Sequence, residues 1–497
     1  MMEPFEQVLS IGQRVGLGPQ DMERAKGRIL QALPAAMAGK AEATAHLMGG
    51  LARNIADNPM LIAWGLRVAA RTAEAVWRRF VDNFVVGVVT ERKATVESIA
   101  PELGYHPPVT LVLNPTMRCN LRCKGCYAFS YDRQSDMDRG LLCRVLTEAR
   151  ELGVQFITVT GGEPFLYPEI EGIFETFSDM IFMVYTNGQH IDAGRARRLA
   201  ELGNVWPAVS VEGYEAETDA RRGAGVYARL GAAMRDMQEH GVLFGISAVP
   251  TRHNTELLAS DAFLDHYIDK GALFGWMFTY MPIGRQPDTS LMATPAQRDL
   301  LRRQSLHWRR TRPIFMADFW NDGPLCGGCM SGSRFAFITN DGWVQPCTFV
   351  HFATHNVRTH SLREIFDSDF FRCIRARQPY GQNLLRPCKI IDHPEVLREV
   401  VAECGAKPTY PEAARIVEDR AIREHLDGYS RDYGRLADEA WAGPDYGSGH
   451  SVQVPFYGSV DLYEIYGWRL NKTAGQSASA PDPSPEPRRV GRRPDGG

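Results

Sequence analysis

The sequence predicts an α/β protein built on a partial (β/α)6 barrel of the TIM type, with an N-terminal helical region and a small C-terminal extension that contains cysteines. Three observations predict this fold. Short β-type runs alternate with helical patterns between residues 108 and 285, a helical apolar stripe precedes them, and a segment rich in Gly and Cys follows. Alternating strands and helices favour a parallel sheet with covering helices. Six such units do not complete an eight-fold barrel.

The length and composition suit a multi-domain globular protein. The chain has 497 residues, of which 44% are apolar, enough for one large domain and smaller ones. A formal net charge of −3 gives no global field that attracts nucleic acid, so we expect no nucleic-acid partner. No apolar run approaches the ~18–20 residues that span a bilayer. Charged residues also interrupt the first segment, which argues against a signal peptide.

These features predict a cytoplasmic protein with reduced thiols. The ten cysteines are then metal ligands or core residues before they are disulfides. We predict five segments: a helical region over 1–104, an α/β core over 105–312, a cysteine-containing domain over 313–405, a mixed segment over 406–471 and a disordered tail over 472–497.

The N-terminal region carries an amphipathic stretch over residues 60–86. Its stripe has helical period and is flanked by arginines; the members are Ile62, Leu66, Ala69, Ala73, Val76, Trp77, Phe80 and Phe84. Two alternatives stay open. The stripe packs on the barrel, or it lies on the inner face of the membrane as a peripheral contact.

The expected strands follow in order and end near the motifs that carry chemistry. They are Val109–Leu113, Phe156–Thr160, Ile181–Tyr185, Val205–Val211, Val242–Val249 and Leu273–Tyr280. Parallel α/β folds place their chemistry at the carboxyl ends of the strands. We therefore expect the site at the carboxyl ends of these strands, where the motifs below fall.

Three cysteines follow the first strand, with the spacing C-x3-C-x2-C. They are Cys119, Cys123 and Cys126. A [4Fe–4S] cluster takes four thiolates, so three of them leave one iron open to another molecule. A structural zinc site is the alternative for this spacing.

A second motif, Gly161-Gly162-Glu163, ends the second strand. Two glycines let a ligand approach the backbone closely, and the carboxylate can pair with an ammonium group. Such a turn alone is a weak signal. Beside the cysteine triad it is a strong one.

Together the two motifs resemble the radical S-adenosylmethionine (SAM) superfamily over roughly residues 105–285. The resemblance implies that the open iron binds the amino and carboxylate groups of SAM. It assigns the cluster to Cys119, Cys123 and Cys126, and SAM contacts to Gly161, Gly162, Glu163, Asn187, Ser210 and Arg222. The segment Met281–Gly284 resembles the adenine-contacting end of the sixth strand.

Two positions depart from the family pattern. Glu212 stands where Asp is commoner, and Gly125 stands where many members carry an aromatic residue before the third cysteine. Tyr127 follows that cysteine instead.

A second cysteine region begins with Cys326 and Cys329. An Asn-Asp-Gly turn at 340–342 predicts a hairpin that brings Cys329 close to Cys347. Cys388 lies further along, after a proline.

The run from Cys329 to Cys347 resembles the opening of a SPASM or twitch extension, which implies an auxiliary [4Fe–4S] cluster. Its expected ligands are Cys329, Cys347 and Cys388, with Cys326 as the fourth candidate and His351 or His355 as its replacement. A zinc site or buried thiols are the alternatives. The remaining downstream cysteines are too widely spaced for a further full cluster.

The resemblance implies an enzyme that reductively cleaves SAM to a 5′-deoxyadenosyl radical, which then abstracts hydrogen from a substrate. The electron donor would be a protein such as ferredoxin or flavodoxin. The absence of a winged-helix pattern in the first 100 residues and the stripe over 60–86 favour a lipid or other apolar small molecule as substrate. A peptide-modifying maturase is the alternative, and a non-catalytic iron–sulfur electron carrier is the alternative of another class.

Overall fold

The computed structural model describes residues 16–37, 59–128, 135–284, 286–446, 451–454 and 458–461. Its main sheet has the strand order β7-β6-β5-β4-β3-β2-β1-β8-β9. The strands are β1 Thr110–Thr116, β2 Phe156–Gly161, β3 Ile181–Thr186, β4 Val205–Val211, β5 Gly245–Ala248, β6 Phe274–Met277, β7 Phe315–Asp318, β8 Phe335–Ile338 and β9 Val344–Gln345. All neighbours from β7 to β8 are parallel, and β9 returns antiparallel to β8.

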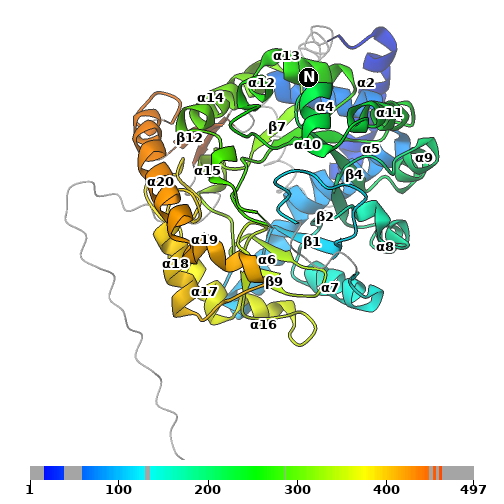
Figure 1. Cartoon of the computed structure of the whole chain (residues 1–497). Helices are drawn as coiled ribbons and strands as arrows, with labels where there is room; N and C mark the ends of the chain where they lie inside the picture. The colour runs from blue at the N-terminus through cyan, green and yellow to red at the C-terminus, as the bar shows by residue number, and fades with distance from the viewer. Residues whose placement is uncertain are drawn as a thin grey trace, which may run out of the picture.

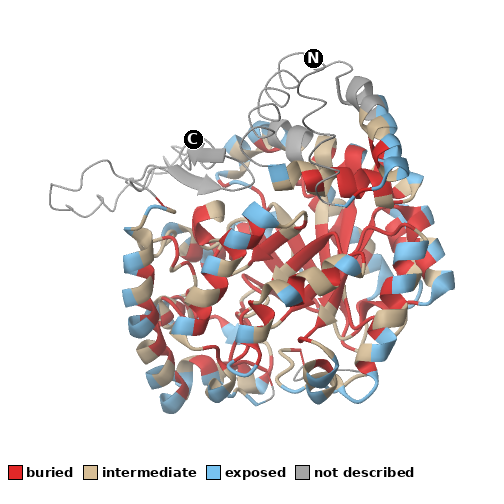
Figure 2. Ribbon diagram, turned by 90° about the horizontal axis from the view of Figure 1, so that it is seen from above, coloured by how far each residue is buried: buried red, intermediate tan, exposed pale blue. Residues whose placement is uncertain are grey.

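This sheet confirms the predicted partial barrel, because β1 to β6 fall on the six expected runs. Helices cover its outside (Figure 1), and the buried strands lie inside a shell of helices whose outer sides are exposed (Figure 2). The covering helices are α7 Arg139–Glu151, α8 Ile170–Thr176, α9 Ala193–Leu202, α10 Glu215–Arg222, α11 Val226–Glu239, α12 Thr255–Leu258, α13 Asp261–Asp269 and α14 Pro295–Thr311. Side-chain caps at Asp138, Asp192, Ser260 and Thr294 start four of them.

The N-terminal helices close the end of the barrel where the strands begin. They are α2 Pro19–Met37, α4 Pro59–Arg71, α5 Glu74–Arg79, the π-helical η1 Phe80–Glu91 and α6 Arg92–Leu103. The indole Nε1 of Trp64 donates to the Leu273 carbonyl at 2.6 Å, and Arg67 Nη1 donates to the Pro313 carbonyl at 2.7 Å. Those carbonyls precede β6 and β7, so the helices are tied to the strand starts.

Most of the stripe over residues 60–86 is buried in this contact. Leu66, Val76 and Phe80 are at most 7% exposed, and the Phe80 ring lies 5.9 Å from that of Trp206 on β4. Ile62, Ala73 and Phe84 are half-buried. Most of the side chains that would enter a lipid surface are therefore used inside the molecule. The structure supports packing on the barrel over the membrane contact. None of the described helices has the length and hydropathy needed to cross a bilayer.

The C-terminal region adds two strands to the main sheet and forms two small two-stranded sheets besides. The predicted hairpin is confirmed as β8 and β9, and β8 also pairs with β1. The helices here are α15 Gly323–Cys326, α16 Leu362–Phe366, α17 Asp369–Ala376, α18 Pro394–Glu403, α19 Arg415–Glu418 and α20 Arg420–Trp441. β10 Phe352–Ala353 pairs with β11 Lys407–Pro408, and β12 Ser451–Val454 pairs with β13 Gly458–Asp461. Short 3-10 turns are η2 Pro164–Leu166, η3 Thr289–Leu291 and η4 Pro411–Ala414.

A long helix, α20, occupies the segment that the sequence analysis treated as weakly patterned. Its buried face packs beside α14, where the Arg298 guanidinium lies 3.7 Å above the Tyr433 ring and 2.6 Å from Asp392. The predicted disordered tail over 472–497 lies outside the described residues.

Candidate cluster and cofactor site

The loop after β1 brings the predicted triad together. Cys119 Sγ accepts the backbone N–H of Leu121 at 3.4 Å. Burial raises the pKa of the Cys126 thiol, and Cys123 and Cys119 raise it further. The three cysteines thus lie on one loop within electrostatic reach of one another, and three thiolates from one loop are a donor set that fits a [4Fe–4S] cluster with one open iron.

The Gly-Gly-Glu segment lies against the start of this loop. Gly162 N–H donates to Thr116 O at 2.9 Å, and a Cβ on Gly162 would lie 2.2 Å from Arg118 O. Gly161 has φ of 125°, and its Cβ would lie 2.4 Å from Thr116 O. Only glycine allows this approach of the two backbones.

The Glu163 carboxylate is already engaged. It is fully buried and accepts from Phe165 N at 3.2 Å, Thr186 Oγ1 at 2.8 Å and Asn187 N at 2.7 Å. Burial raises the pKa of Glu163 to about 7, although these hydrogen bonds lower it. The side chain thus fastens the end of β2 to the end of β3, instead of standing free to meet an ammonium group.

Asn187 and Ser210 lie at the ends of β3 and β4. The Asn187 amide donates to Asn120 Oδ1 at 2.8 Å and lies 3.8 Å from Cys119 Sγ, so it touches the cluster loop. Ser210 is half-buried and stands in register with Ser247 of β5 and, through it, with Trp276 of β6. The structure therefore brings Asn187 into contact with the loop of the cysteine triad, although 67 residues separate it from Asn120.

Glu212 binds two arginines at once. It is 1% exposed, and its oxygens lie 2.5 Å from Arg221 Nη1 and 2.5 Å from Arg222 Nη2. Burial alone would lower the pKa of Arg222. Glu212 and the thiols of Cys123 and Cys126 raise it by more, so the net shift of the pKa is upward. The longer carboxylate at this departing position thus orients the predicted SAM-binding arginine toward the cluster loop.

The end of β6 also packs on that loop. A Cβ at Gly125 would lie 2.9 Å from Cε2 of Tyr280, so the Tyr280 ring fills the space an aromatic residue at 125 would need. Gly284, with φ of 86°, would place a Cβ 2.7 Å from Cys126 O. The second departure from the family pattern is therefore compensated in space by Tyr280.

The sequence analysis missed a buried Tyr–His pair beside this loop. Gly284 N–H donates to Tyr410 Oη at 3.1 Å, and the Tyr410 hydroxyl donates to His351 Nδ1. His351 Nε2–H donates to Thr348 O at 2.8 Å, which fixes the tautomer. Burial lowers the pKa of His351 to about 4. Residue types and spacing gave no signal, because 126 residues separate Tyr410 from Gly284.

The other three cysteines of the second region each lie within electrostatic reach of Cys329. Burial raises the pKa of Cys347 to about 11 and of Cys326 and Cys388 to about 12, and Cys329 adds to all three shifts. Phe349 N–H donates to Cys347 Sγ at 3.5 Å, and Ile390 N–H donates to Cys388 Sγ at 3.3 Å. A donor set of four cysteines fits a fully ligated [4Fe–4S] cluster, although the described residues contain no group of three such side chains drawn close enough to hold a single metal ion.

The histidines that were alternatives to Cys326 point elsewhere. His351 is bonded to Tyr410 and Thr348, and His355 Nδ1 lies 2.8 Å from Thr354 Oγ1. Cys373 and Cys404 form a pair of their own between α17 and α18, where Cys404 Sγ lies 3.8 Å from Asp369 O.

Comparison with known proteins finds matches over the regions that contain both sets of cysteines. Residues 113–259 match the radical SAM superfamily, and residues 329–390 match SPASM, an iron-sulfur cluster-binding domain. The mycofactocin maturase MftC of Mycobacterium ulcerans is 32% identical over 300 residues, which are 56% of this chain and 80% of the maturase. This chain belongs to the radical SAM superfamily.

Other similar proteins differ from the maturase in the activity that their names give. An AdoMet-dependent heme synthase of Oleidesulfovibrio alaskensis is 24% identical over 298 residues, 53% of this chain and 76% of the synthase. The crystal structure of Streptococcus suis SuiB bound to S-adenosylmethionine has a TM-score of 0.51 at 19% identity, covering 60% of this chain and 76% of SuiB, and shows the shared fold. The chain is a radical SAM enzyme with a SPASM domain, so the alternative of a non-catalytic electron carrier is not supported.

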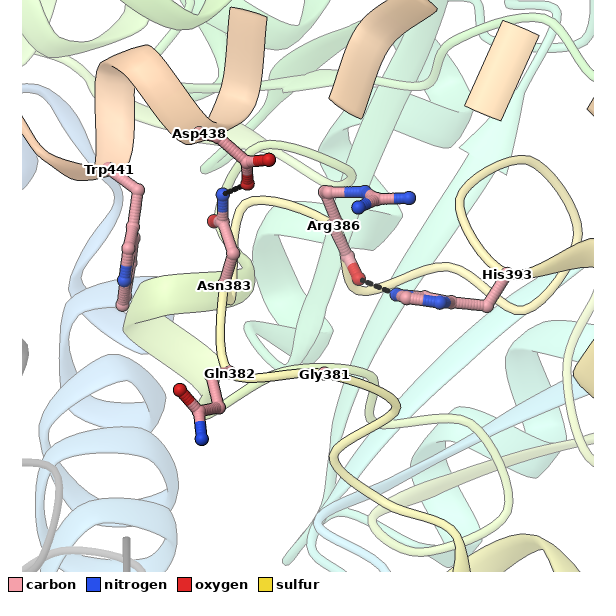
Figure 3. Close-up of a pocket in the computed structure, with 7 residues that line it drawn as sticks. All are labelled: Gly381, Gln382, Asn383, Arg386, His393, Asp438 and Trp441. Carbon is pink, nitrogen blue, oxygen red and sulfur yellow. Dashed lines mark hydrogen bonds between the residues drawn. The ribbon is translucent and has the colours of Figure 1, made fainter. Parts of the chain in front are cut away.

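This radical SAM enzyme also has a cavity outside the barrel, of about 340 Å³. Figure 3 shows it between the loop that leads to Cys388 and the last turn of α20. Asn383 Nδ2 donates to Asp438 at 2.8 Å, and His393 Nε2 donates to the Arg386 carbonyl at 3.0 Å across its wall. These bonds fix the loop that carries Cys388.

Proposed function

We propose that this radical SAM enzyme modifies a peptide, by removing a hydrogen atom from a carbon of one of its residues. The observation that carries the proposal is the match to a maturase and to a peptide cyclase over most of their length. MftC is matched over 80% of its chain, and the PqqA peptide cyclase of Methylorubrum extorquens is 28% identical over 318 residues, 78% of the cyclase. The lipid substrate that the sequence favoured has no comparable support, because most of its stripe is buried.

The chain's own residues prepare this chemistry. When bound and reduced, the first cluster supplies the electron that cleaves SAM to methionine and the radical that takes the hydrogen atom. Cys119, Cys123 and Cys126 would hold that cluster, and Arg222, paired with Glu212, would bind the SAM carboxylate. Cys326, Cys329, Cys347 and Cys388 would hold the auxiliary cluster.

An aromatic wall supports a substrate group that is apolar or flat. Tyr185, Trp276, Phe278, Phe319 and Phe349 are all half-buried although they lie at or beyond the strand ends. Tyr185 and Phe278 have ring centroids 5.4 Å apart, Trp276 stacks on Phe278 at 5.8 Å, and Phe278 lies 5.3 Å from Phe319. Such rings bind apolar or aromatic side chains well.

The same aromatic wall also fits a second candidate substrate, a tetrapyrrole. The heme synthases of Oleidesulfovibrio alaskensis and Methanosarcina barkeri are each 24% identical to this chain, and a flat macrocycle also suits aromatic faces.

An extract from a strain that lacks the gene tests the proposal. The anaerobic, reduced enzyme is given SAM and the extract, and 5′-deoxyadenosine is measured with the extract untreated, protease-digested or reduced to its solvent-extractable part. We expect the untreated extract to stimulate 5′-deoxyadenosine formation and protease to abolish the stimulation. Stimulation that survives protease and follows the solvent extract would overturn the peptide proposal and favour a tetrapyrrole or lipid.

A further inference from the structure

A buried lysine lies beside the auxiliary thiols. Lys389 is 2% exposed, and its Nζ donates to Ser331 Oγ and lies 3.4 Å from Tyr380 Oη. The Ser331 hydroxyl donates its own proton to Pro346 O at 2.8 Å, so it can only accept a hydrogen bond from the ammonium. Within the part of the chain that the structure describes, no carboxylate pairs with this ammonium.

A buried ammonium needs an opposite charge nearby. Leaving it without one costs several kcal/mol, on the order of the penalty for any unpaired buried ion. Hydroxyl groups of Ser331 and Tyr380 satisfy hydrogen bonds but carry no charge. The missing anion must therefore be something that these side chains surround.

The thiols around Cys329 lie in the reach of both Lys389 and Tyr380. Lys389 follows Cys388 in the chain, its partner Ser331 lies two residues after Cys329, and the Ser331 hydroxyl donates to the carbonyl of Pro346, which precedes Cys347. Tyr380 Oη lies 3.4 Å from Lys389 Nζ. Burial raises the pKa of Tyr380, and Cys329 and Cys388 raise it further, as thiols near its hydroxyl would.

An iron–sulfur cluster held by four thiolates is the anion that fits. Its net charge is negative in both oxidation states and becomes one unit more negative on reduction, so a fixed cation nearby favours the reduced form. We propose that Lys389 is the buried counter-charge of the auxiliary cluster, and that Tyr380 relays it by a hydrogen bond to Cys329. Together the two residues raise the reduction potential of that cluster.

Lys389→Met in the holoenzyme tests the counter-charge. We expect at least a tenfold lower ratio of reduced to oxidised auxiliary cluster at a given potential, which is about 59 mV for one electron. The potential of the first cluster should stay as in the wild type. The measurement is an anaerobic redox titration followed by paramagnetic resonance, with iron and sulfide analysis to show full loading. Lys407→Met is the matched control, because Lys407 is exposed on β11.

Two more variants keep the test decisive. Lys389→Arg retains the charge and should retain the wild-type potential, whereas Tyr380→Phe should lower the potential by less than Lys389→Met does. A fully loaded Lys389→Met enzyme with the wild-type potential overturns the proposal. If Lys389→Met fails to load, an unchanged potential in Tyr380→Phe, or a lowered one in Lys389→Arg, overturns it instead.

Discussion

At the scale of single residues, a backbone hydrogen bond marks the cluster cysteines. The thiols of Cys119, Cys126, Cys347 and Cys388 each accept the N–H of the residue two positions later. Such bonds stabilise a thiolate and tune a cluster. In contrast, Cys373 receives its bond from the Arg377 side chain at 2.7 Å.

Cys123→Ala should abolish formation of 5′-deoxyadenosine while the chain stays folded. The remaining two thiols cannot hold a cluster that keeps its open iron. The measurement is 5′-deoxyadenosine produced from SAM after reduction, beside a circular dichroism spectrum. Cys143→Ala, on the covering helix α7, is the control and should stay active. Activity in the Cys123 variant would show that the ligand assignment is wrong.

Glu212→Gln should lower the free energy of unfolding by about 2–4 kcal/mol, because it leaves two half-buried arginines without their buried carboxylate. Urea unfolding under anaerobic conditions measures the loss. Glu215→Gln, three residues on and exposed, should change stability by under about 1 kcal/mol. Equal stability of the two variants would mean that the pairing of Glu212 with Arg221 and Arg222 contributes nothing.

The sequence predicted candidate ligands but not their surroundings. Cysteine spacing singles out Cys119, Cys123 and Cys126 as candidates because three ligands can come from one short loop. It cannot identify Tyr410, His351 or Lys389, whose partners are brought to them by the tertiary fold. The sequence also could not predict the role of Glu163, because two of its hydrogen-bond donors, Thr186 and Asn187, lie at the end of β3.

At the scale of elements, the π-helical segment η1 begins with an aromatic anchor. Phe80 is 7% exposed, and its ring lies 5.8 Å from Trp64 and 5.7 Å from Phe84. Phe80→Ala should cost about 3–5 kcal/mol, since it opens a cavity between the N-terminal helices and β4. Thermal or urea unfolding measures this, with the exposed Arg78→Ala as control. A loss below about 1 kcal/mol would contradict the packing described for the stripe.

The loop before β10 gives the protein a pH-dependent element. His351 has an unfolded pKa near 6.5 and a folded pKa of about 4, so below pH 6.5 the unfolded chain binds the extra proton. The contribution of neutral His351 to the free energy of unfolding is fully present above pH 6.5. It is lost as the pH falls toward 4, and the loss is roughly 3 kcal/mol at most. His351→Gln, which can keep both hydrogen bonds, should show a flatter stability profile between pH 4 and 6.5. Parallel profiles for the two proteins would exclude His351 as the source.

Elements were predictable where their own sequence decides them. The six β-type runs and the Asn-Asp-Gly hairpin carry local signals, and both are found. β7, which follows Pro313, is too short to stand out, and α20 was missed although Ile422, Leu426, Tyr429 and Tyr433 form a helical stripe. The pairing of β8 with β1 joins strands more than 200 residues apart, so no local pattern encodes it.

At the scale of the whole molecule, the two cluster regions share one sheet. β1 leads into the loop of Cys119, and its neighbour β8 belongs to the SPASM domain. Further bonds fasten that domain to the barrel: Glu148 on α7 accepts the Leu362 N–H at 2.7 Å, and the Asn340 amide donates to Ser135 Oγ at 2.8 Å. The spacing of the clusters is thus set by strand pairing, not by a linker.

This arrangement predicts that the clusters load independently. The wild type should hold about eight irons, and Cys347→Ala about four, because only the auxiliary site loses a ligand. Since the β8–β1 pairing does not depend on Cys347, the first cluster should still cleave SAM in this variant when an artificial reductant supplies the electron. Iron analysis and 5′-deoxyadenosine measured on the same preparation decide it. Loss of all iron on this one change would mean that the barrel site needs the auxiliary cluster in place, and that the two regions form one cooperative unit.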